Sequence, residues 1–160
     1  MQRLPATLDA TLAQAIVDRT MRIIECNVNV MDHRGIIIAS GERARIGSLH
    51  EGATLVLAQG RTVEIDAALA ARLHDARQGI NLPLRTEGGV VGVVGISGEP
   101  EAIRHYAELV RMAAETMLEQ SRMARLLARD TRLREELVLQ MVGEIPSQAD
   151  AIASLAKRIG

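Results

Sequence analysis

Apolar side chains follow helical spacing in two long segments of the chain. In 7–26 they recur every three to four residues, which predicts an amphipathic helix capped by Asp9 or Thr7. In 100–141 the same spacing continues with no glycine and no internal proline, and about 40 residues at 1.5 Å per residue would make a rod of roughly 60 Å. One continuous helix and two helices broken near 129–131 both fit this second segment.

Between these helices, apolar and polar residues alternate in two segments that are typical of β-hairpins. The first segment, 28–38, is interrupted by Asp32-His33-Arg34-Gly35, a loop of hairpin length that ends in glycine. The second segment, 79–98, turns at Glu87-Gly88-Gly89 and contains Gly95 inside an otherwise β-branched strand. Because glycine weakens a strand unless a close neighbour requires the missing side chain, we expect Gly95 to face a ligand.

The remaining segments complete an α+β pattern. A helix beginning near the middle of the segment 43–53 ends at Gly60, where glycine provides a left-handed C-terminal cap. The residues 62–66 are typical of a short strand, and those after Asp66 of a short helix. The order helix, hairpin, helix, strand, short helix, hairpin and long helix predicts an antiparallel sheet flanked by helices, with a long C-terminal helix, rather than alternating βαβ units.

The long helix has two groups of apolar residues with different expected roles. Those expected to cover the sheet are Ile103, Tyr106, Leu109, Val110, Ala113 and Met117. Those that form a candidate dimer seam among many charged residues are Leu126, Leu127, Leu133, Leu137 and Val138.

The composition excludes several kinds of site. One tyrosine and no phenylalanine or tryptophan leave no aromatic platform on which bases, flavins or sugars could stack. One cysteine, Cys26, excludes an internal disulfide framework, and no His/Cys/Asp cluster has ligand spacing, so we expect no metal and no cofactor. The formal net charge of -1 provides no overall basic bias toward nucleic acid. The absence of a leader and of a long apolar run predicts a soluble, cytoplasmic chain with no membrane contact.

The segment RARIGSLHEGA, 43–53, leads two arginines into the predicted start of a helix. The first turn of a helix leaves backbone N–H groups without partners, and the helix dipole attracts anions. The amides of Ile46 and Gly47 would therefore hold a carboxylate or phosphate, and Arg45 could form a bidentate pair with it. His50 lies one turn further on. The alternative is that the arginines are solvated loop charges and that His50 caps or packs against the helix.

The segment GINLPL, 79–84, is the second candidate site. Pro83 prevents normal pairing on one side of a strand, which fits an exposed edge or a bulge beside a pocket. The amide of Asn81 could donate there to a hydroxyl or carboxylate oxygen, or it could equally satisfy a local turn.

Three segments, 13–53, 78–101 and 119–138, together closely resemble the N-terminal sugar-diacid recognition domain of the carbohydrate diacid regulators, a family of bacterial transcription activators. The resemblance implies a PAS-like sensor fold that binds small sugar acids such as glucarate, galactarate or glycerate and switches genes for their catabolism. The family motif R-I-G-x-x-H falls on Arg45, Ile46, Gly47 and His50. The family motif G-x-N-L-P-L falls on Gly79, Asn81, Leu82, Pro83 and Leu84.

The resemblance also implies how the chain is organised. We expect a sensor core over 1–100, a signalling and dimerisation helix over 101–143 and the start of a linker over 144–160. In the family this linker leads to a C-terminal DNA-binding region, which would provide the contact with DNA and which this chain does not reach. A homodimer is expected.

The predicted ligand-binding residues are Arg45, Ile46, Gly47, His50, Asn81, Leu82, Pro83 and Gly95. One ligand carboxylate would sit on the amides of Ile46 and Gly47 beside Arg45, and His50 and Asn81 would bond its hydroxyls or second carboxylate. Binding would shift the sheet against the long helix and bias the geometry of the dimer.

Two alternatives remain at this stage, a dimerisation module without a ligand and a small sugar-acid enzyme. No G-x-S-x-G, P-loop or G-x-G-x-x-G motif occurs, and no group of residues combines a nucleophile, a base and an oxyanion hole. We therefore do not expect an enzyme.

Overall fold

The computed structural model describes residues 8–74, 76–143 and 156–157. The chain divides into two compact units, Met1–Ser121 and Arg122–Gly160. The predicted linker over 144–160 lies outside the described residues apart from 156–157, as does Thr7, the alternative cap of the first helix.

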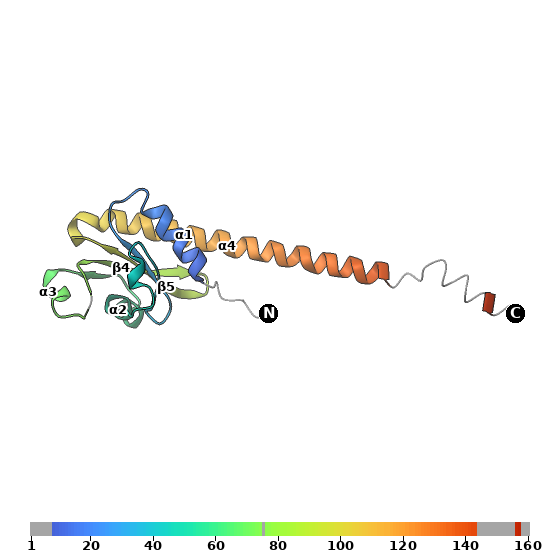
Figure 1. The fold of residues 1–160 in the computed structure, drawn as a ribbon, viewed down its shortest axis with the longest axis horizontal. Helices are drawn as coiled ribbons and strands as arrows, with labels where there is room; N and C mark the ends of the chain where they lie inside the picture. Colours follow the sequence, from blue (N-terminus) through green and yellow to red (C-terminus); the bar gives the residue numbers. More distant parts are fainter. Residues whose placement is uncertain (1–7, 75, 144–155, 158–160) are drawn as a thin grey trace. The chain divides into compact units, whose positions relative to one another are not determined.

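Five antiparallel strands form one sheet with the order β2-β1-β5-β4-β3 (Figure 1). The strands are β1 (Val28–Met31), β2 (Ile37–Ser40), β3 (Val63–Ile65), β4 (Gly79–Thr86) and β5 (Gly89–Ser97). Both predicted hairpins are confirmed, since β1 pairs with β2 and β4 pairs with β5. Gly89 pairs with Thr86, so the second turn is shorter than predicted and consists of Glu87 and Gly88.

The predicted helices are present, with different bounds. They are α1 (Ala10–Thr20), α2 (Glu51–Gln59), α3 (Ala67–Ala70) and α4 (Pro100–Gly143), and a 3-10 turn, η1 (Arg43–Arg45), precedes α2. Asp9 caps α1 by accepting the Leu12 N–H at 2.8 Å, and Gly60 ends α2 in the left-handed conformation, with φ of 66°. The first helix ends at Thr20, whose hydroxyl donates to the Ile16 carbonyl at 2.6 Å.

One face of the sheet packs against α1 and the first part of α4 (Figure 1). Leu82, Val94 and Ile96 belong to this apolar cluster. The residues of α4 that are buried against it are Ile103, Ala107, Val110, Ala114 and Leu118. The prediction that Tyr106, Leu109 and Ala113 also cover the sheet is wrong, because these three are exposed and only one stripe of a helix can face a flat layer.

The opposite face of the sheet packs against α2 (Figure 1). Its apolar cluster is smaller and includes Met31, Val63 and Val93 from the sheet with Ala53 and Val56 from α2. The α+β, PAS-like architecture with helices on both faces of an antiparallel sheet is thus confirmed.

Helix α4 is uninterrupted from Pro100 to Gly143, so the alternative of two helices broken near 129–131 is wrong. In the second unit, the predicted seam residues Leu126, Leu133 and Leu137 are all about half exposed or more. Within the described ranges, no helix combines the length and the apolar character that crossing a membrane would require.

Candidate functional site

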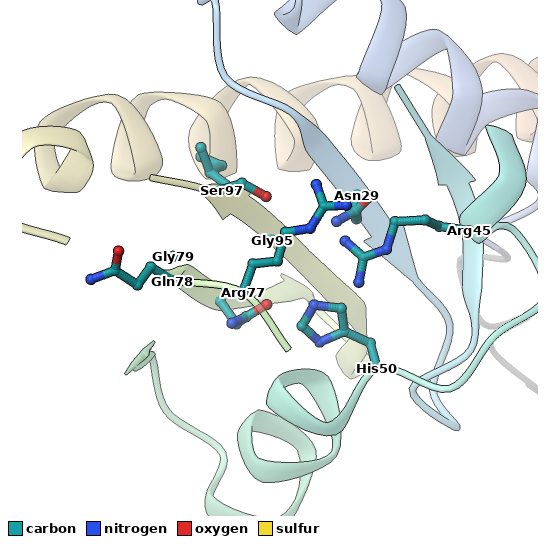
Figure 2. Close-up of a pocket in the computed structure, with 10 residues that line it drawn as sticks. Asn29, Arg45, His50, Arg77, Gln78, Gly79, Gly95 and Ser97 are labelled. Atoms are coloured by element: carbon teal, nitrogen blue, oxygen red, sulfur yellow. The ribbon is translucent and has the colours of Figure 1, made fainter. Parts of the chain in front are cut away.

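A small polar pocket lies in the first unit (Figure 2). It contains about 220 Å³ of empty space, part of which is open to solvent. Its lining residues are Asn29, Arg45, His50, Arg77, Gln78, Gly79, Asn81, Gly95, Ile96 and Ser97. The enclosed part of the pocket is smaller than this volume, so a large ligand would require the surrounding side chains to move.

The floor of the pocket is one row of residues across three strands. Asn29 on β1 pairs with Gly95 on β5, and Gly95 pairs with Asn81 on β4. A Cβ atom at Gly95 would lie 2.6 Å from Asn81 Oδ1, closer than side chains tolerate. The missing side chain therefore allows the Asn81 side chain to lie against the backbone of Gly95. Gly95, which the sequence predicts to face a ligand, lies in the lining of the pocket.

Asn81 holds a buried acceptor at this floor. The residue is 3% exposed, and no hydrogen-bond donor within the described part of the chain reaches its Oδ1. Its Nδ2 lies against Gly52, where an added Cβ would come within 2.8 Å. Leaving a buried polar atom without a partner costs about 1–3 kcal/mol, so an arrangement of this kind points to a ligand that supplies the donor.

Asn29, at the other end of the row, belongs to a hydrogen-bond network. Its Oδ1 accepts from Ser40 Oγ at 2.6 Å and from Asn27 Nδ2 at 3.2 Å. Ser40 Oγ in turn accepts the Glu42 N–H at 3.0 Å. The floor of the pocket is thus connected to the loop that leads into η1 and carries Arg45.

Basic side chains provide the walls. Figure 2 shows the guanidinium groups of Arg45 and Arg77 extending into the same space, with the His50 ring below them. Arg45 and His50 are buried, at 9% and 7% exposure. Guanidinium groups bind carboxylates and phosphates, so two arginines in the lining suit the pocket to an anion.

His50 has two functions in this geometry. Its Nδ1 accepts the Ala53 N–H at 3.2 Å, which caps α2. In the neutral ring the proton is therefore on Nε2, which makes that nitrogen a donor. The predicted alternative that His50 caps the helix is confirmed, and the same residue lines the pocket.

Arg77 is bound to a carboxylate at the rim. Its two terminal nitrogens donate to Glu42 Oε1 and Oε2 at 2.6 and 3.0 Å. The hydrogen bonds from Arg77 hold the pKa of the Glu42 carboxyl below its usual value of 4.5, and the positive charge of Arg45 acts in the same direction. Glu42 is therefore negatively charged at neutral pH.

The structure does not bring Ile46 and Gly47 into the pocket lining. The Ile46 N–H donates to the Arg43 carbonyl at 3.2 Å, and the Gly47 N–H donates to the Ile37 carbonyl at 2.8 Å. Both residues are exposed, and α2 begins only at Glu51. The expectation of unpaired amides at these two positions is thus wrong, because η1 and the edge of β2 take up the amides before the helix starts.

Leu82 and Pro83 also lie outside the lining. Leu82 is fully buried in the cluster under α1 and α4, on the face opposite Asn81, because successive strand residues point to opposite faces. Pro83 pairs with Val93 on β5, and the pairing of β4 with β3 ends before it, at Asn81. The lack of an N–H group at Pro83 therefore removes no hydrogen bond to β3.

The prediction of ligand-binding residues missed six of the ten lining residues, namely Asn29, Arg77, Gln78, Gly79, Ile96 and Ser97. Asn29 offered a signal, since it is a polar residue inside a strand that is buried along its length. Arg77 offered none, because only the pairing of distant segments brings it beside Arg45. Among the described residues, no group of three or more His, Cys, Asp or Glu side chains is arranged to hold a metal ion.

Solved structures with a similar arrangement are distant. The GAF domain of a phosphoenolpyruvate-protein phosphotransferase from Acinetobacter matches with a TM-score of 0.49 and 16% identity, over 71% of this chain and 84% of that one. The cofactor-binding GAF domain of the nutrient sensor CodY from Clostridium difficile matches with a TM-score of 0.45 and 15% identity, over 70% and 84% of the two chains.

Sequence relatives are much closer. The carbohydrate diacid regulator of Escherichia coli is 61% identical over 96% of this chain and 40% of its own length. An uncharacterised protein of Haemophilus influenzae is 48% identical over 84% of this chain and 37% of its own. The chain thus spans about two fifths of these curated relatives. Residues 8–141 match the family model described as "Putative sugar diacid recognition". The chain belongs to this sugar diacid recognition family.

Proposed function

We propose that the chain is the ligand-sensing part of a cytoplasmic transcriptional regulator, and that its pocket binds a small hydroxy acid such as glycerate, glucarate or galactarate. The family membership and the identity to a carbohydrate diacid regulator support a sensing role in regulation. DNA would be contacted by a region outside this chain.

The observation that carries this proposal is the Asn81 oxygen, which is buried and lacks a donor among the described residues. An ionised carboxylate has only acceptors, so it cannot serve this oxygen, whereas a hydroxyl can. A hydroxy acid would place its hydroxyl on Asn81 and its carboxylate on Arg45 and the Nε2–H of His50. One small molecule would then donate a hydrogen bond to Asn81 on the floor and accept hydrogen bonds from Arg45 and His50 on the wall.

Isothermal titration with glycerate and with propionate, which lacks the hydroxyls, tests the proposal. We expect binding of glycerate and at least tenfold weaker binding of propionate, since losing one hydrogen bond to a buried group costs about 1.4 kcal/mol or more. Arg45→Ala should lose binding, and Arg43→Ala, which removes an exposed arginine from the same 3-10 turn, should keep it. Equal binding of the two acids, or unchanged binding in Arg45→Ala, would contradict the proposed site.

Two polar contacts between the sheet and α4 support a route for the signal. Arg104 on α4 donates to both oxygens of Glu64 on β3, at 2.8 and 3.0 Å. The Arg85 N–H, at the irregularity in β4, donates to Glu115 on α4 at 2.8 Å. A ligand that moves β3 or β4 would thereby move α4, provided that it binds the two arrangements with different affinities.

The exposed apolar residues of the second unit support dimerisation as part of the same function. Leu126, Leu133 and Leu137 recur near heptad spacing along α4 and are exposed. We expect a homodimer that Leu133→Glu converts toward a monomer in light scattering after size exclusion. A dimer that binds none of the acids would favour the ligand-free module, and turnover of glycerate observed by NMR would favour an enzyme.

A further inference from the structure

Asn29 is the second asparagine of the pocket floor, and only one end of its amide remains for a ligand. The residue is 1% exposed and lines the pocket. Its Oδ1 accepts from Ser40 Oγ at 2.6 Å and from Asn27 Nδ2 at 3.2 Å. A carbonyl oxygen has two lone pairs, so these two donors occupy both of them. Asn29 can therefore meet a ligand only as a donor, through its Nδ2.

Ser40 fixes this orientation of the amide. Its Oγ accepts the Glu42 N–H at 3.0 Å, so its single hydroxyl hydrogen is available for Asn29. The separation of 2.6 Å is usual for an O–H···O bond, whereas N–H···O bonds are rarely shorter than about 2.7 Å. The oxygen of the Asn29 amide, and not its nitrogen, therefore faces Ser40. Ser40 is itself 1% exposed, so water does not compete for this contact.

The donor of Asn29 and the acceptor of Asn81 lie on the two sides of Gly95. Gly95 pairs with Asn29 on β1 and with Asn81 on β4 (Figure 2). Asn81 Oδ1 leans over Gly95, since a Cβ atom built on this glycine would lie 2.6 Å from it. Neighbouring strands are about 4.8 Å apart, so one ligand oxygen held above Gly95 can reach both side chains.

We propose that the two asparagines recognise one hydroxyl of the ligand from both sides, so that the hydroxyl donates to Asn81 Oδ1 and accepts from Asn29 Nδ2. This inference rests on the function proposed above and makes it more specific. An oxo oxygen has no hydrogen, so it could accept from Asn29 but would provide no donor for Asn81. The site thus takes hydroxy acids, with one carboxylate or with two, in preference to oxo acids of the same carbon skeleton.

Three acids of equal charge separate the two contacts when each is titrated into the whole 160-residue chain. Glycerate, hydroxypyruvate and 3-hydroxypropionate share the carbon skeleton, the carboxylate and the terminal hydroxyl. At the carbon beside the carboxylate they carry a hydroxyl, an oxo group and hydrogen alone, respectively. We expect the affinity to fall in that order, by about threefold to tenfold at each step, as for the loss of one hydrogen bond between neutral groups. A contact with Asn81 alone would instead make the last two acids equal.

Ser40→Ala tests the positioning role of the hydroxyl. Without it the Asn29 amide is no longer fixed, so the step between hydroxypyruvate and 3-hydroxypropionate should shrink to about twofold or less, while glycerate remains the tightest ligand. Thr20→Val is the matched control and should keep both steps. The Thr20 hydroxyl is also buried and also donates one hydrogen bond of 2.6 Å, to the Ile16 carbonyl, but Thr20 does not line the pocket. Circular dichroism should confirm that both variants fold, and the order of the three acids in the unaltered chain tests the proposal without them.

The outcomes separate the two proposals. If glycerate binds and the other two acids bind equally, the role of Asn29 is overturned and the hydroxy-acid site stands. If hydroxypyruvate binds as tightly as glycerate, recognition of one hydroxyl from both sides is overturned. If none of the three acids binds, both proposals fail. A step that Ser40→Ala preserves as fully as Thr20→Val does would overturn the positioning role of Ser40.

Discussion

One face of the sheet buries only apolar side chains around Leu82, whereas the other face buries the polar side chain of Asn81, the adjacent residue of β4. Leu82 points into the cluster under α1 and α4 and is fully buried among apolar side chains. Asn81 points to the other face, where it is almost as buried but keeps an oxygen for which the described residues supply no donor. The first face stabilises the fold through apolar burial, whereas the buried oxygen on the second face lowers its stability.

The position of the helices explains why the faces differ. Helices α1 and α4 cover the first face, whereas residues of the shorter helices α2 and α3 pack against the second. The row Asn29, Gly95 and Asn81 crosses the second face, and Arg45 in η1 together with Arg77 and Gln78, which precede β4, lines the pocket beside this row. The pocket therefore lies where the strands carry the polar residues Asn29 and Asn81.

The largest expected effect comes from breaking the apolar face. Leu82→Ala should lower the free energy of unfolding by about 2–5 kcal/mol, because it removes a fully buried side chain and leaves a cavity. Urea denaturation followed by circular dichroism measures this change. Glycerate affinity of the folded fraction should stay within twofold of the unaltered chain. A loss below about 1 kcal/mol would show that the first face is not the main source of stability.

Filling the gap in the polar row should cost stability and binding together. Gly95→Ala places a methyl group 2.6 Å from Asn81 Oδ1, so we expect a loss of about 1–3 kcal/mol in the free energy of unfolding and at least tenfold weaker glycerate binding. Gly88→Ala is the control, since its Cβ would meet only Thr86 Oγ1 at 3.8 Å. Unchanged affinity in Gly95→Ala would mean that the ligand does not reach the row.

Asp32 provides the contrast of a polar group with its partners in place. It accepts the N–H groups of Arg34 and Ile36 at 2.8 and 3.1 Å and pairs with the Arg34 guanidinium. Asp32→Ala should therefore cost about 1–2 kcal/mol, as lost capping residues do, and Asp32→Asn, which keeps an acceptor, clearly less.

The stability contributed by Asp32 should also depend on pH. Burial alone would raise the pKa of Asp32, but the two backbone N–H groups and the Arg34 guanidinium outweigh it and hold the pKa below its usual 3.8. Since the pKa is lower in the folded chain, this contribution is complete above about pH 5 and is lost as the pH falls through the folded value. Thermal melts of the unaltered chain and Asp32→Asn should converge at low pH, and a constant difference in Tm would contradict this assignment.

The smallest expected change in stability belongs to Asn81→Leu. The substitution removes a buried oxygen for which the described residues supply no donor, and leucine has nearly the same shape as asparagine. The free energy of unfolding should therefore change by no more than about 1 kcal/mol in either direction. Binding of glycerate should nevertheless be lost. A stable variant that still binds would assign the hydroxyl to a different group, and a strongly destabilised variant would show that the Asn81 side chain is structural.

Much of the fold could be predicted from spacing alone. The cap at Asp9, the left-handed Gly60, both hairpins and the start of the long helix at Pro100 depend on a few neighbouring residues, and all of them are present. The predicted bounds of the helices were less accurate, since α1 is shorter than the predicted helix over 7–26 and α2 starts at Glu51, later than predicted. Local hydrogen bonds at Thr20 and in η1 determine where α1 ends and where α2 begins. The spacing of hydrophobic residues contains no information about these hydrogen bonds.

The candidate site was predicted only in part. Arg45, His50, Asn81 and Gly95 line the pocket, whereas Ile46, Gly47, Leu82 and Pro83 do not. Their proximity in sequence to the lining residues was misleading, because neighbours on a strand face opposite ways and the amides of Ile46 and Gly47 already donate to other segments.

The sequence by itself therefore determined the elements, since caps, turns and amphipathic spacing act within a few residues. Only the tertiary structure decided the site, because the register across β1, β5 and β4 sets Asn29, Gly95 and Asn81 in one row. The same is true of the rim, where the pairing of distant segments brings Arg77 to Glu42. Register and pairing depend on the packing of all five strands at once, and no local pattern contains that information.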